Sequence, residues 1–227
     1  GILIKSGEHL ERAHKMDTIV FDKTGTITRG EPEVTDIVAI DEMGEDELLR
    51  VAATVEKASE HPLGQAIVRK GEEKSLEITE PETFTAVPGM GLEAVLEGKD
   101  ILIGNRRLMK EYSISTGETE EELFRLEEEG KTAMIIAIDE KIRGIIAVAD
   151  QLKDNSKEAI RELQDMGLEV YMLTGDNERT ARAIAKQVGI EKVLAEVLPE
   201  NKAEVVEQIK DDGKNVGMVG DGINDAP

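Results

Sequence analysis

Two short polar segments follow apolar runs near opposite ends of the chain, and both carry residues suited to phosphoryl chemistry. Residues 22–26 read Asp-Lys-Thr-Gly-Thr after the apolar run 18–21, and residues 220–225 read Gly-Asp-Gly-Ile-Asn-Asp after the run 216–219. Each segment places a carboxylate, Asp22 or Asp221, in a glycine-containing turn at the end of an expected strand. One carboxylate can attack a phosphorus atom while the other holds the Mg²⁺ that neutralises the phosphate.

A third segment of the same kind lies between them. Residues 174–176 read Thr-Gly-Asp and follow the apolar run 170–173. The carboxyl ends of parallel strands share one edge of a sheet, so Asp22, Asp176 and Asp221 are expected to converge there. Mg²⁺ relieves their mutual repulsion, because it prefers carboxylate and phosphate oxygens. A single Asp after a strand is commonly a turn or cap residue, but three such sites favour a functional edge.

The elements that position these residues alternate between strand and helix. Helical patterns cover 156–166, 180–188 and 201–209, and apolar runs cover 170–173, 193–194 and 216–219. This alternation predicts an α/β fold with a doubly wound parallel sheet, for which the run 18–21 supplies the first strand. Residues 1–30 and 145–227 are therefore expected to form one discontinuous domain.

The intervening residues 31–144 are expected to form an inserted α+β domain. Apolar residues recur at helical spacing over 48–55 and 63–68, and Pro62 marks a helix start. Short apolar runs punctuated by glycine predict antiparallel strands at 84–87, 92–96, 101–103, 133–138 and 142–148. A charged helix is expected over 118–129.

Composition narrows the function classes. The net charge of −21 argues against nucleic-acid binding and requires any phosphate site to be locally positive. No cysteine and only three histidines are present, which argues against thiolate or His-rich metal sites. Aromatic residues make up 2% of the 227, so a nucleotide base finds few rings to stack on.

No run approaches the roughly 18 apolar residues of a membrane span. The start at Gly1 without Met and the abrupt end at Pro227 suggest an excised fragment. We expect this fragment to be soluble and monomeric.

Together these segments resemble a known family. Residues 22–28 resemble the phosphorylation motif of P-type ATPases, and 174–176 and 220–225 resemble that family's two other core motifs, in the family's order. Pro199 and Lys202 resemble the lysine motif of the parent haloacid dehalogenase superfamily. The similarity spans nearly the whole chain, and it implies a phosphorylation domain with an inserted nucleotide-binding domain.

The insert resembles the heavy-metal-transporting branch. Its signatures are Ser-Glu-His-Pro at 59–62, Gly-Met-Gly at 89–91 and Gly-Asn at 104–105, and Asn177 after Thr-Gly-Asp also fits this branch. Residues 60–64 and 195–199 are closest to copper(I)-transporting members. The resemblance implies that the nucleotide is contacted by these residues: Glu56, His61, Gly89, Gly91, Gly104 and Asn105.

The resemblance also implies a mechanism. Asp22 would attack the γ-phosphorus of ATP, with Lys202 and the Thr174 hydroxyl on the transferred oxygens. Asp176, Asn224 and Asp225 would position this set of loops. Mg²⁺ would sit between Asp22, the Thr24 carbonyl, Asp221 and the phosphate. The implied partners are ATP and the actuator and transmembrane domains of a parent pump, at the cytoplasmic face of a membrane.

Thr24 separates this interpretation from its first alternative, a stand-alone phosphatase of the same superfamily. In such phosphatases the motif at this position is Asp-x-Asp, and its second Asp is the general acid/base. The corresponding residue here is Thr24. Losing that base should slow hydrolysis of the phosphoenzyme by roughly 10² to 10⁴. The second alternative is a nucleotide sensor that never transfers phosphate, and Asp22 and Lys202 argue against it. His61 without the resemblance is interpreted as a helix cap or a surface residue.

Overall fold

The chain forms two compact units in a computed structural model that describes residues 6–40 and 42–220. One unit comprises Gly1–Gly30 with Gln151–Pro227, and the other is Glu31–Asp150. The boundary expected between 144 and 145 falls inside strand β7 (Lys141–Ala149), whose last residues pair with the second unit's strands. Over the described ranges, every helix is too short or too polar to cross a membrane.

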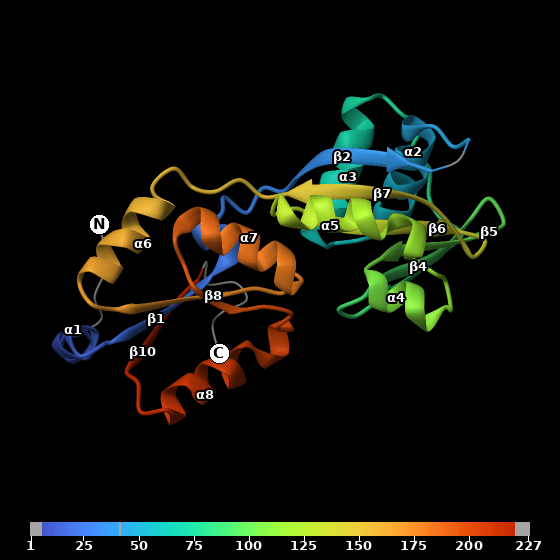
Figure 1. The fold of residues 1–227 in the computed structure, drawn as a ribbon. Coiled ribbons are helices and arrows are strands. Elements are labelled where there is room, and N and C mark those ends of the chain that lie inside the picture. The colour runs from blue at the N-terminus through green and yellow to red at the C-terminus, as the bar shows by residue number, and fades with distance from the viewer. Residues whose placement is uncertain (1–5, 41, 221–227) are drawn as a thin grey trace. The chain divides into compact units, whose positions relative to one another are not determined.

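The first unit is built on a four-stranded sheet with the order β10-β1-β8-β9. Its strands are β1 (Thr18–Asp22), β8 (Glu169–Leu173), β9 (Lys192–Leu194) and β10 (Val216–Val219). Every pairing is parallel, so all four carboxyl ends meet at one edge. Strand β1 lies between β10 and β8, so the three strands that precede the three motifs are neighbours in the sheet (Figure 1).

Helices cover both faces of this sheet, which confirms the doubly wound prediction. Strand β8 sends Val170 and Met172 into one core with α6 (Ser156–Asp165) and α7 (Glu178–Val188). Its alternate residue Leu173 packs with α8 (Lys202–Asp211) in a second core. Because side chains alternate between the two faces along a strand, successive residues of β8 contribute to both cores. The short helices α1 (Gly7–His14) and η3 (Pro199–Asn201) complete the described part of the unit.

The second unit is built on a six-stranded antiparallel sheet with the order β2-β7-β6-β5-β4-β3. Besides β7, its strands are β2 (Glu33–Ala39), β3 (Thr83–Val87), β4 (Gly91–Leu96), β5 (Lys99–Gly104) and β6 (Thr132–Ile138). Its helices are α2 (Glu45–Glu56), α3 (Pro62–Glu73), α4 (Arg106–Glu111), η2 (Gly117–Thr119) and α5 (Glu120–Glu128).

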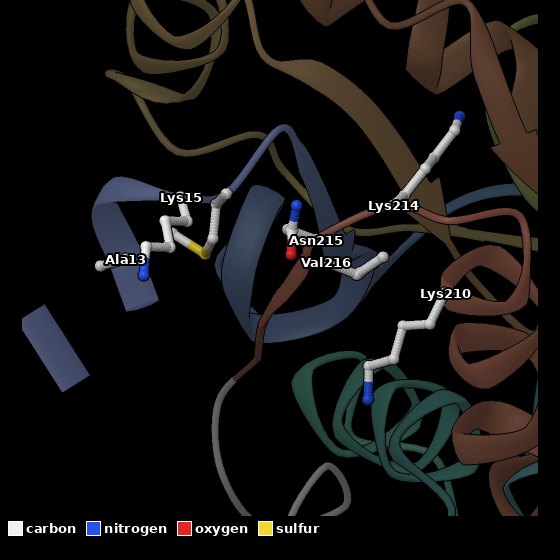
Figure 2. A pocket seen from close by; sticks show the side chains of 7 residues that line it. Ala13, Lys15, Lys210, Lys214, Asn215 and Val216 are labelled. Atoms are coloured by element: carbon white, nitrogen blue, oxygen red, sulfur yellow. The ribbon is translucent and has the colours of Figure 1, made fainter. Parts of the chain in front are cut away.

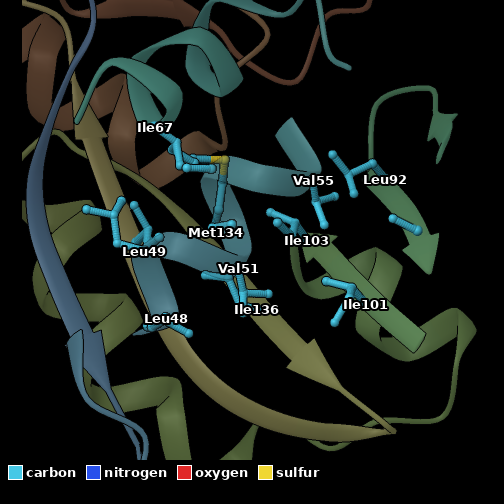
Figure 3. Packing of buried hydrophobic residues seen from close by; sticks show 14 of the residues in the cluster. Leu48, Leu49, Val51, Val55, Ile67, Leu92, Ile101, Ile103, Met134 and Ile136 are labelled. Carbon is cyan, nitrogen blue, oxygen red and sulfur yellow. The ribbon is translucent and has the colours of Figure 1, made fainter. Parts of the chain in front are cut away.

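Two apolar layers lie on opposite faces of that sheet. Ile101 and Ile103 of β5 pack under α2 and α3, whereas Leu102 packs with α4 and α5. Figure 3 shows the first layer, in which Val55 of α2 lies beside Leu92 and Ile103. The alternation along one strand separates the two layers, as expected for a sheet buried on both faces.

Candidate functional site

Asp22 lies at the carboxyl end of β1 and is only 6% exposed. The ammonium group of Lys202, the first residue of α8, donates a hydrogen bond to Asp22 Oδ1 at 2.8 Å. Both side chains of this ion pair are nearly buried. The structure therefore brings the expected nucleophile and the expected lysine together, although 180 positions separate them in the chain.

The Thr-Gly-Asp segment follows the neighbouring strand β8 and forms its own hydrogen-bonded turn. The Thr174 hydroxyl donates to Asp176 Oδ2 at 3.1 Å and accepts from the Asp176 backbone N–H at 3.1 Å. Lys23 forms an ion pair with the same Asp176 oxygen at 2.7 Å. Thr174 is 3% exposed, so its hydroxyl is held in a fixed position at the sheet edge.

The loop η1 (Lys23–Ile27) connects Asp22 to the rest of the unit and is fixed by hydrogen bonds to its carbonyl groups. The backbone N–H and the hydroxyl of Thr28 both donate to the Lys23 carbonyl at 3.0 Å. The Lys153 ammonium group donates to the Gly25 carbonyl, and the Ser156 hydroxyl donates to the Ile27 carbonyl at 2.7 Å. Gly25 has φ of 73°, a conformation that glycine adopts without strain.

Three lysines bring positive charge to this edge. Lys202 pairs with Asp22, Lys23 pairs with Asp176, and Lys153 donates to the Gly25 carbonyl. In a chain with a net charge of −21, this is the local compensation that a phosphate group requires.

A magnesium ion fits the donor chemistry of the described residues at this edge. The Asp22 carboxylate and the Thr24 backbone carbonyl are hard oxygen donors of the kind that Mg²⁺ prefers. The third expected ligand, Asp221, lies outside the described residues, as do Asn224 and Asp225. Over residues 6–40 and 42–220, no three His, Asp or Glu side chains gather closely enough to hold a metal ion.

Glu56 in the second unit is a buried carboxylate at the end of α2. It is 5% exposed, and a Cβ atom on Gly64 of α3 would lie 2.1 Å from its Oε2. Burial raises the pKa of Glu56 to about 7, and the hydrogen bond with the Ser59 side chain offsets that rise only in part. The absence of a side chain at Gly64 thus makes room for the Glu56 carboxylate beside the start of α3.

His61 caps the helix α3 and remains exposed. Its Nδ1 accepts a hydrogen bond from the Leu63 backbone N–H at 3.2 Å, which satisfies one of the unpaired amides at the helix start. Its own backbone N–H donates to Ser59 Oγ at 3.2 Å. Because Nδ1 accepts, the ring proton of the neutral form lies on Nε2. The interpretation of His61 as a cap is therefore correct, and a ligand contact by the exposed ring stays a prediction.

The glycines at 89, 91 and 104 have reasons within the protein for lacking a side chain. Gly91 and Gly104 oppose each other on β4 and β5, and a Cβ on either would lie 2.1 or 2.2 Å from a backbone carbonyl oxygen. Gly89 has φ of 69° and accepts a hydrogen bond from the Asn105 side-chain amide at 2.9 Å. Asn105 also caps α4 through its side-chain oxygen.

The two groups of expected nucleotide contacts lie at the same end of one apolar layer. Val55, the neighbour of Glu56 in sequence, packs in the same core as Leu92 and Ile103, the neighbours of Gly91 and Gly104. Figure 3 shows these three side chains next to one another. The end of α2 therefore lies over the start of β4 and the end of β5.

A cavity of about 460 Å³ in the first unit lies away from this chemistry. It is lined by Ala13, Lys15, Met16, Lys210, Lys214, Asn215 and Val216, at the amino end of β10. Asp22 lies at the carboxyl end of the neighbouring strand, the opposite edge of the sheet. Figure 2 shows that Lys210 and Lys214 point away from each other, so they do not converge on a shared anion.

Sequence reasoning missed three residues that hold these sites: Lys23, Lys153 and Ser59. Lys23 could have been noticed, because it follows Asp22 directly within the first motif. Lys153 lies in a segment without a local signal, and its contact with Gly25 spans 128 positions. Ser59 belongs to a signature of the insert, but its bonds to Glu56 and His61 appear only in the folded turn.

The chain matches a known protein family and known protein sequences. A family model described as haloacid dehalogenase-like hydrolase matches residues 16–227. Copper-exporting P-type ATPases of Staphylococcus aureus strains bovine RF122 / ET3-1 and MRSA252 are each 55% identical to the chain over 228 residues. These matches cover 100% of this chain but only 28% of the length of those relatives.

Two solved structures are similar in fold and sequence. A crystal structure of a zinc-transporting PIB-type ATPase in an E2.Pi state is 39% identical, with a TM-score of 0.67; the match covers 99% of this chain and 36% of that one. The catalytic domain of the CPx-ATPase CopB-B, studied for conformational changes upon nucleotide binding, is 28% identical with a TM-score of 0.72. That match covers 99% of this chain and 78% of the solved one.

Proposed function

Because the chain belongs to the haloacid dehalogenase-like hydrolase family, we propose that it binds Mg-ATP and phosphorylates itself on Asp22 as the catalytic part of a heavy-metal-transporting P-type ATPase. The copper-exporting relatives support copper(I) as the ion that the parent protein transports. Since the chain spans 28% of their length, the transport path belongs to the remainder of such a protein.

The ion pair between Asp22 and Lys202 is the observation that carries this proposal. It puts a buried carboxylate beside a largely buried ammonium group at the carboxyl edge of a parallel sheet. An Asp22 oxygen forms a bond to the γ-phosphorus of ATP while the bond from that phosphorus to the β,γ-bridging oxygen breaks. ADP leaves with the electron pair of the broken bond, and Asp22 retains the phosphoryl group as an acyl phosphate.

Lys202 and Thr174 stabilise the charge that spreads over the transferred oxygens. When ATP enters, the Lys202 ammonium group exchanges part of its contact with Asp22 for the phosphoryl oxygens. The Thr174 hydroxyl lies on the adjacent strand loop, donates to Asp176 before ATP enters, and then turns its single proton to a phosphoryl oxygen. The contacts with Asp22 and Asp176 hold Lys202 Nζ and Thr174 Oγ1 near the reacting edge, so ATP binding has to redirect only their hydrogen bonds before the transition state.

Asp22 and the Thr24 carbonyl are the described residues that would hold Mg²⁺, with Asp221 as the third protein ligand. When bound, the ion would neutralise negative charge on the carboxylate and the phosphate. Thr24 has no carboxylate, so the acyl phosphate lacks a local base for attack by water and persists. A separate actuator domain of the parent protein is the proposed source of dephosphorylation.

The second unit binds the nucleotide base in this proposal. Glu56, the exposed His61 ring and the β4–β5 end with Gly89, Gly91, Gly104 and Asn105 provide the contacts. Their common location at one end of the α2 layer supports this assignment. The proposed location of the whole assembly is the cytoplasmic face of a membrane, where the parent protein's transmembrane and actuator domains are its partners.

The test is acid-stable labelling from radioactive γ-phosphate. We expect the chain, mixed with Mg²⁺ and γ-labelled ATP and quenched in acid, to retain label that hydroxylamine releases. Asp22→Asn is nearly isosteric but cannot act as the nucleophile, so it should fold normally and retain no label. Fast phosphate release without an acid-stable intermediate would favour the phosphatase. ATP binding without transfer would favour the sensor, and label that persists in Asp22→Asn would remove Asp22 from its role.

A further inference from the structure

We propose that Lys23 is a positioning residue for phosphoryl transfer: it holds Asp176, and Asp176 in turn fixes the position of Thr174 Oγ1, whose hydroxyl proton turns from Asp176 to the transferred phosphate when ATP binds. This inference rests on the proposed function. It extends the site by a residue that binds neither nucleotide nor metal directly.

The geometry carries the first step of this proposal. Asp22 of β1 lies beside Leu173 of β8 in the parallel register, so the residues that follow each strand emerge at neighbouring points of the same edge. Lys23 reaches across that gap to Asp176 Oδ2 at 2.7 Å, and the exposed fractions of the two side chains are 10% and 12%. The same Asp176 oxygen accepts from the Thr174 hydroxyl at 3.1 Å. Lys23, Asp176 and Thr174 therefore form one continuous chain of contacts.

Two consecutive residues of opposite charge thus hold different partners. Asp22 pairs with Lys202 of α8, and Lys23 pairs with Asp176 after β8. The Lys23 carbonyl is fixed by two hydrogen bonds from Thr28, which is fully buried. With its backbone held, the Lys23 side chain has a defined starting point from which to cross to the β8 loop.

The negative charge of Asp176 explains why the side chain that reaches it from β1 is a lysine. An unpaired Asp176 carboxylate beside Asp22 would repel an incoming triphosphate and would be costly to keep so nearly buried. Lys23 neutralises that carboxylate without removing its ability to accept from Thr174.

The experiment is a mutant cycle measured on the whole chain under single-turnover conditions. Its members are the wild type, Lys23→Met, Asp176→Asn and the double variant, and the quantity is the rate constant for hydroxylamine-labile labelling. Misplacing a group by about 1 Å can cost roughly 10²-fold in rate. We expect Lys23→Met to slow labelling about 10- to 100-fold with an unchanged half-saturating ATP concentration, because the base is bound by the second unit.

The Asp176→Asn background distinguishes an indirect role of Lys23, through Asp176, from a direct contact of Lys23 with the phosphate. If Lys23 acts through Asp176, adding Lys23→Met there causes little further slowing. An equal slowing in both backgrounds would mean that Lys23 touches the phosphate itself and would overturn the proposal. An unchanged rate constant in Lys23→Met, after correction for folded protein, would make the ion pair structural only and would also overturn it.

Folding and the parent proposal are controlled separately. Lys23→Met removes the ammonium group that pairs with Asp176 and should lower the melting temperature, whereas the double variant removes both charges of this pair and should recover most of it. A double variant that melts near the wild type but labels as slowly as Asp176→Asn supports positioning.

A second measurement needs no turnover. The binding of Mg²⁺-beryllofluoride, read as a rise in melting temperature, should weaken in the variants that label slowly. If the wild-type chain never becomes labelled, the proposed function itself is wrong. If the wild type becomes labelled and Lys23→Met labels equally fast, only this inference is wrong.

Discussion

At the scale of single residues, several side chains carry two roles that local sequence cannot separate. His61 caps α3 through Nδ1 while its ring stays exposed, and Asn105 caps α4 while it holds Gly89. Asn177, which follows Thr-Gly-Asp, caps α7 by accepting from the Arg179 and Thr180 amides. A signature residue of this kind supports a helix start whether or not it also touches a ligand.

Replacing His61 by Asn separates its cap role from its ring role. Asn is among the best N-cap residues, so His61→Asn should melt like the wild type. We expect it to bind ATP more weakly, because stacking on a base is worth roughly 1–3 kcal/mol, or about 5- to 150-fold in affinity. His61→Ala should lose the cap as well, at about 0.5–2 kcal/mol of stability. Calorimetric titration and thermal melts measure both, and wild-type ATP affinity in His61→Asn would make His61 a cap only.

Glu56 should make the stability of the protein fall as pH rises. Its folded-state pKa of about 7 exceeds the ordinary value of 4.5, so its favourable contribution is fully present below pH 4.5 and is lost as pH rises through 7. The difference between these limits is about 3 kcal/mol. Glu56→Gln, which cannot ionise, should therefore match the wild type near pH 4.5 and exceed its stability near pH 8.

The measurement is a series of urea titrations from about pH 4.5 to about pH 8, the range over which Glu56 changes its protonation state. Glu60→Gln is the matched control, since Glu60 is an exposed carboxylate in the same turn. A difference between Glu56→Gln and the wild type that stays constant across this range would contradict the burial argument for Glu56.

At the scale of elements, the predicted strands and helices match the structure where the apolar pattern is strong. The acidic helix expected over 118–129 is present as η2 and α5. Sequence reasoning missed α1, β2 and α4. The strand β2 is at the sheet edge and none of its residues is buried, and α4 is only six residues long. Edge position and short length both weaken the periodic signal that identifies an element.

The β4–β5 pair should tolerate no side chain at Gly104. A Cβ there would lie 2.2 Å from the Met90 carbonyl oxygen and 2.7 Å from Leu108. Because a backbone oxygen cannot move aside cheaply, we expect Gly104→Ala to cost about 3 kcal/mol, the upper end for overpacked sites.

Thermal melts of Gly104→Ala and Gly44→Ala measure this cost. A methyl group on Gly44 would have no neighbouring atom of the described residues within 4 Å, so its alanine variant controls for loss of a glycine without overpacking and carries only the Gly-to-Ala difference at the N-cap of α2. Equal melting temperatures for the two variants would show that the sheet end yields to a methyl group.

At the scale of the whole chain, the unit Glu31–Asp150 should fold alone, whereas 31–144 should not. Residues 145–148 of β7 are at most 1% exposed and pair with β2 and β6. Among the described strands, β7 is the only neighbour of β2 in the sheet, so removing these residues unpairs most of β2. Circular-dichroism melts should show a cooperative transition for 31–150 and none for 31–144.

The folded 31–150 fragment should also bind ATP in the presence of EDTA, because the carboxylates expected to hold Mg²⁺ belong to the other unit. Cooperative folding of 31–144 would show that these β7 residues are dispensable. A folded 31–150 fragment that fails to bind ATP, when the whole chain binds it, would move the base site out of this unit.

The sequence by itself determined which strands are followed by residues suited to phosphoryl chemistry, and that Asp22 and residues 174–176 lie at one edge of a parallel sheet. An apolar run followed directly by Asp, or by Thr-Gly-Asp, marks the carboxyl end of a buried strand, and parallel strands share that end. The match of the family model to residues 16–227 confirms the resemblance that these motifs carried. Both inferences depend on residues adjacent in the chain, for which local pattern is sufficient.

Only the tertiary structure decided which charged groups pair with each other. Lys23 and Lys202 could each neutralise either aspartate, and the fold assigns Lys202 to Asp22 and Lys23 to Asp176. It also gave the last residues of β7 to the second unit and put Glu56 against Gly64. These outcomes depend on strand register, side-chain direction and contacts between distant residues. Such contacts form only when the packed core fixes the distance between elements, so no local pattern encodes them.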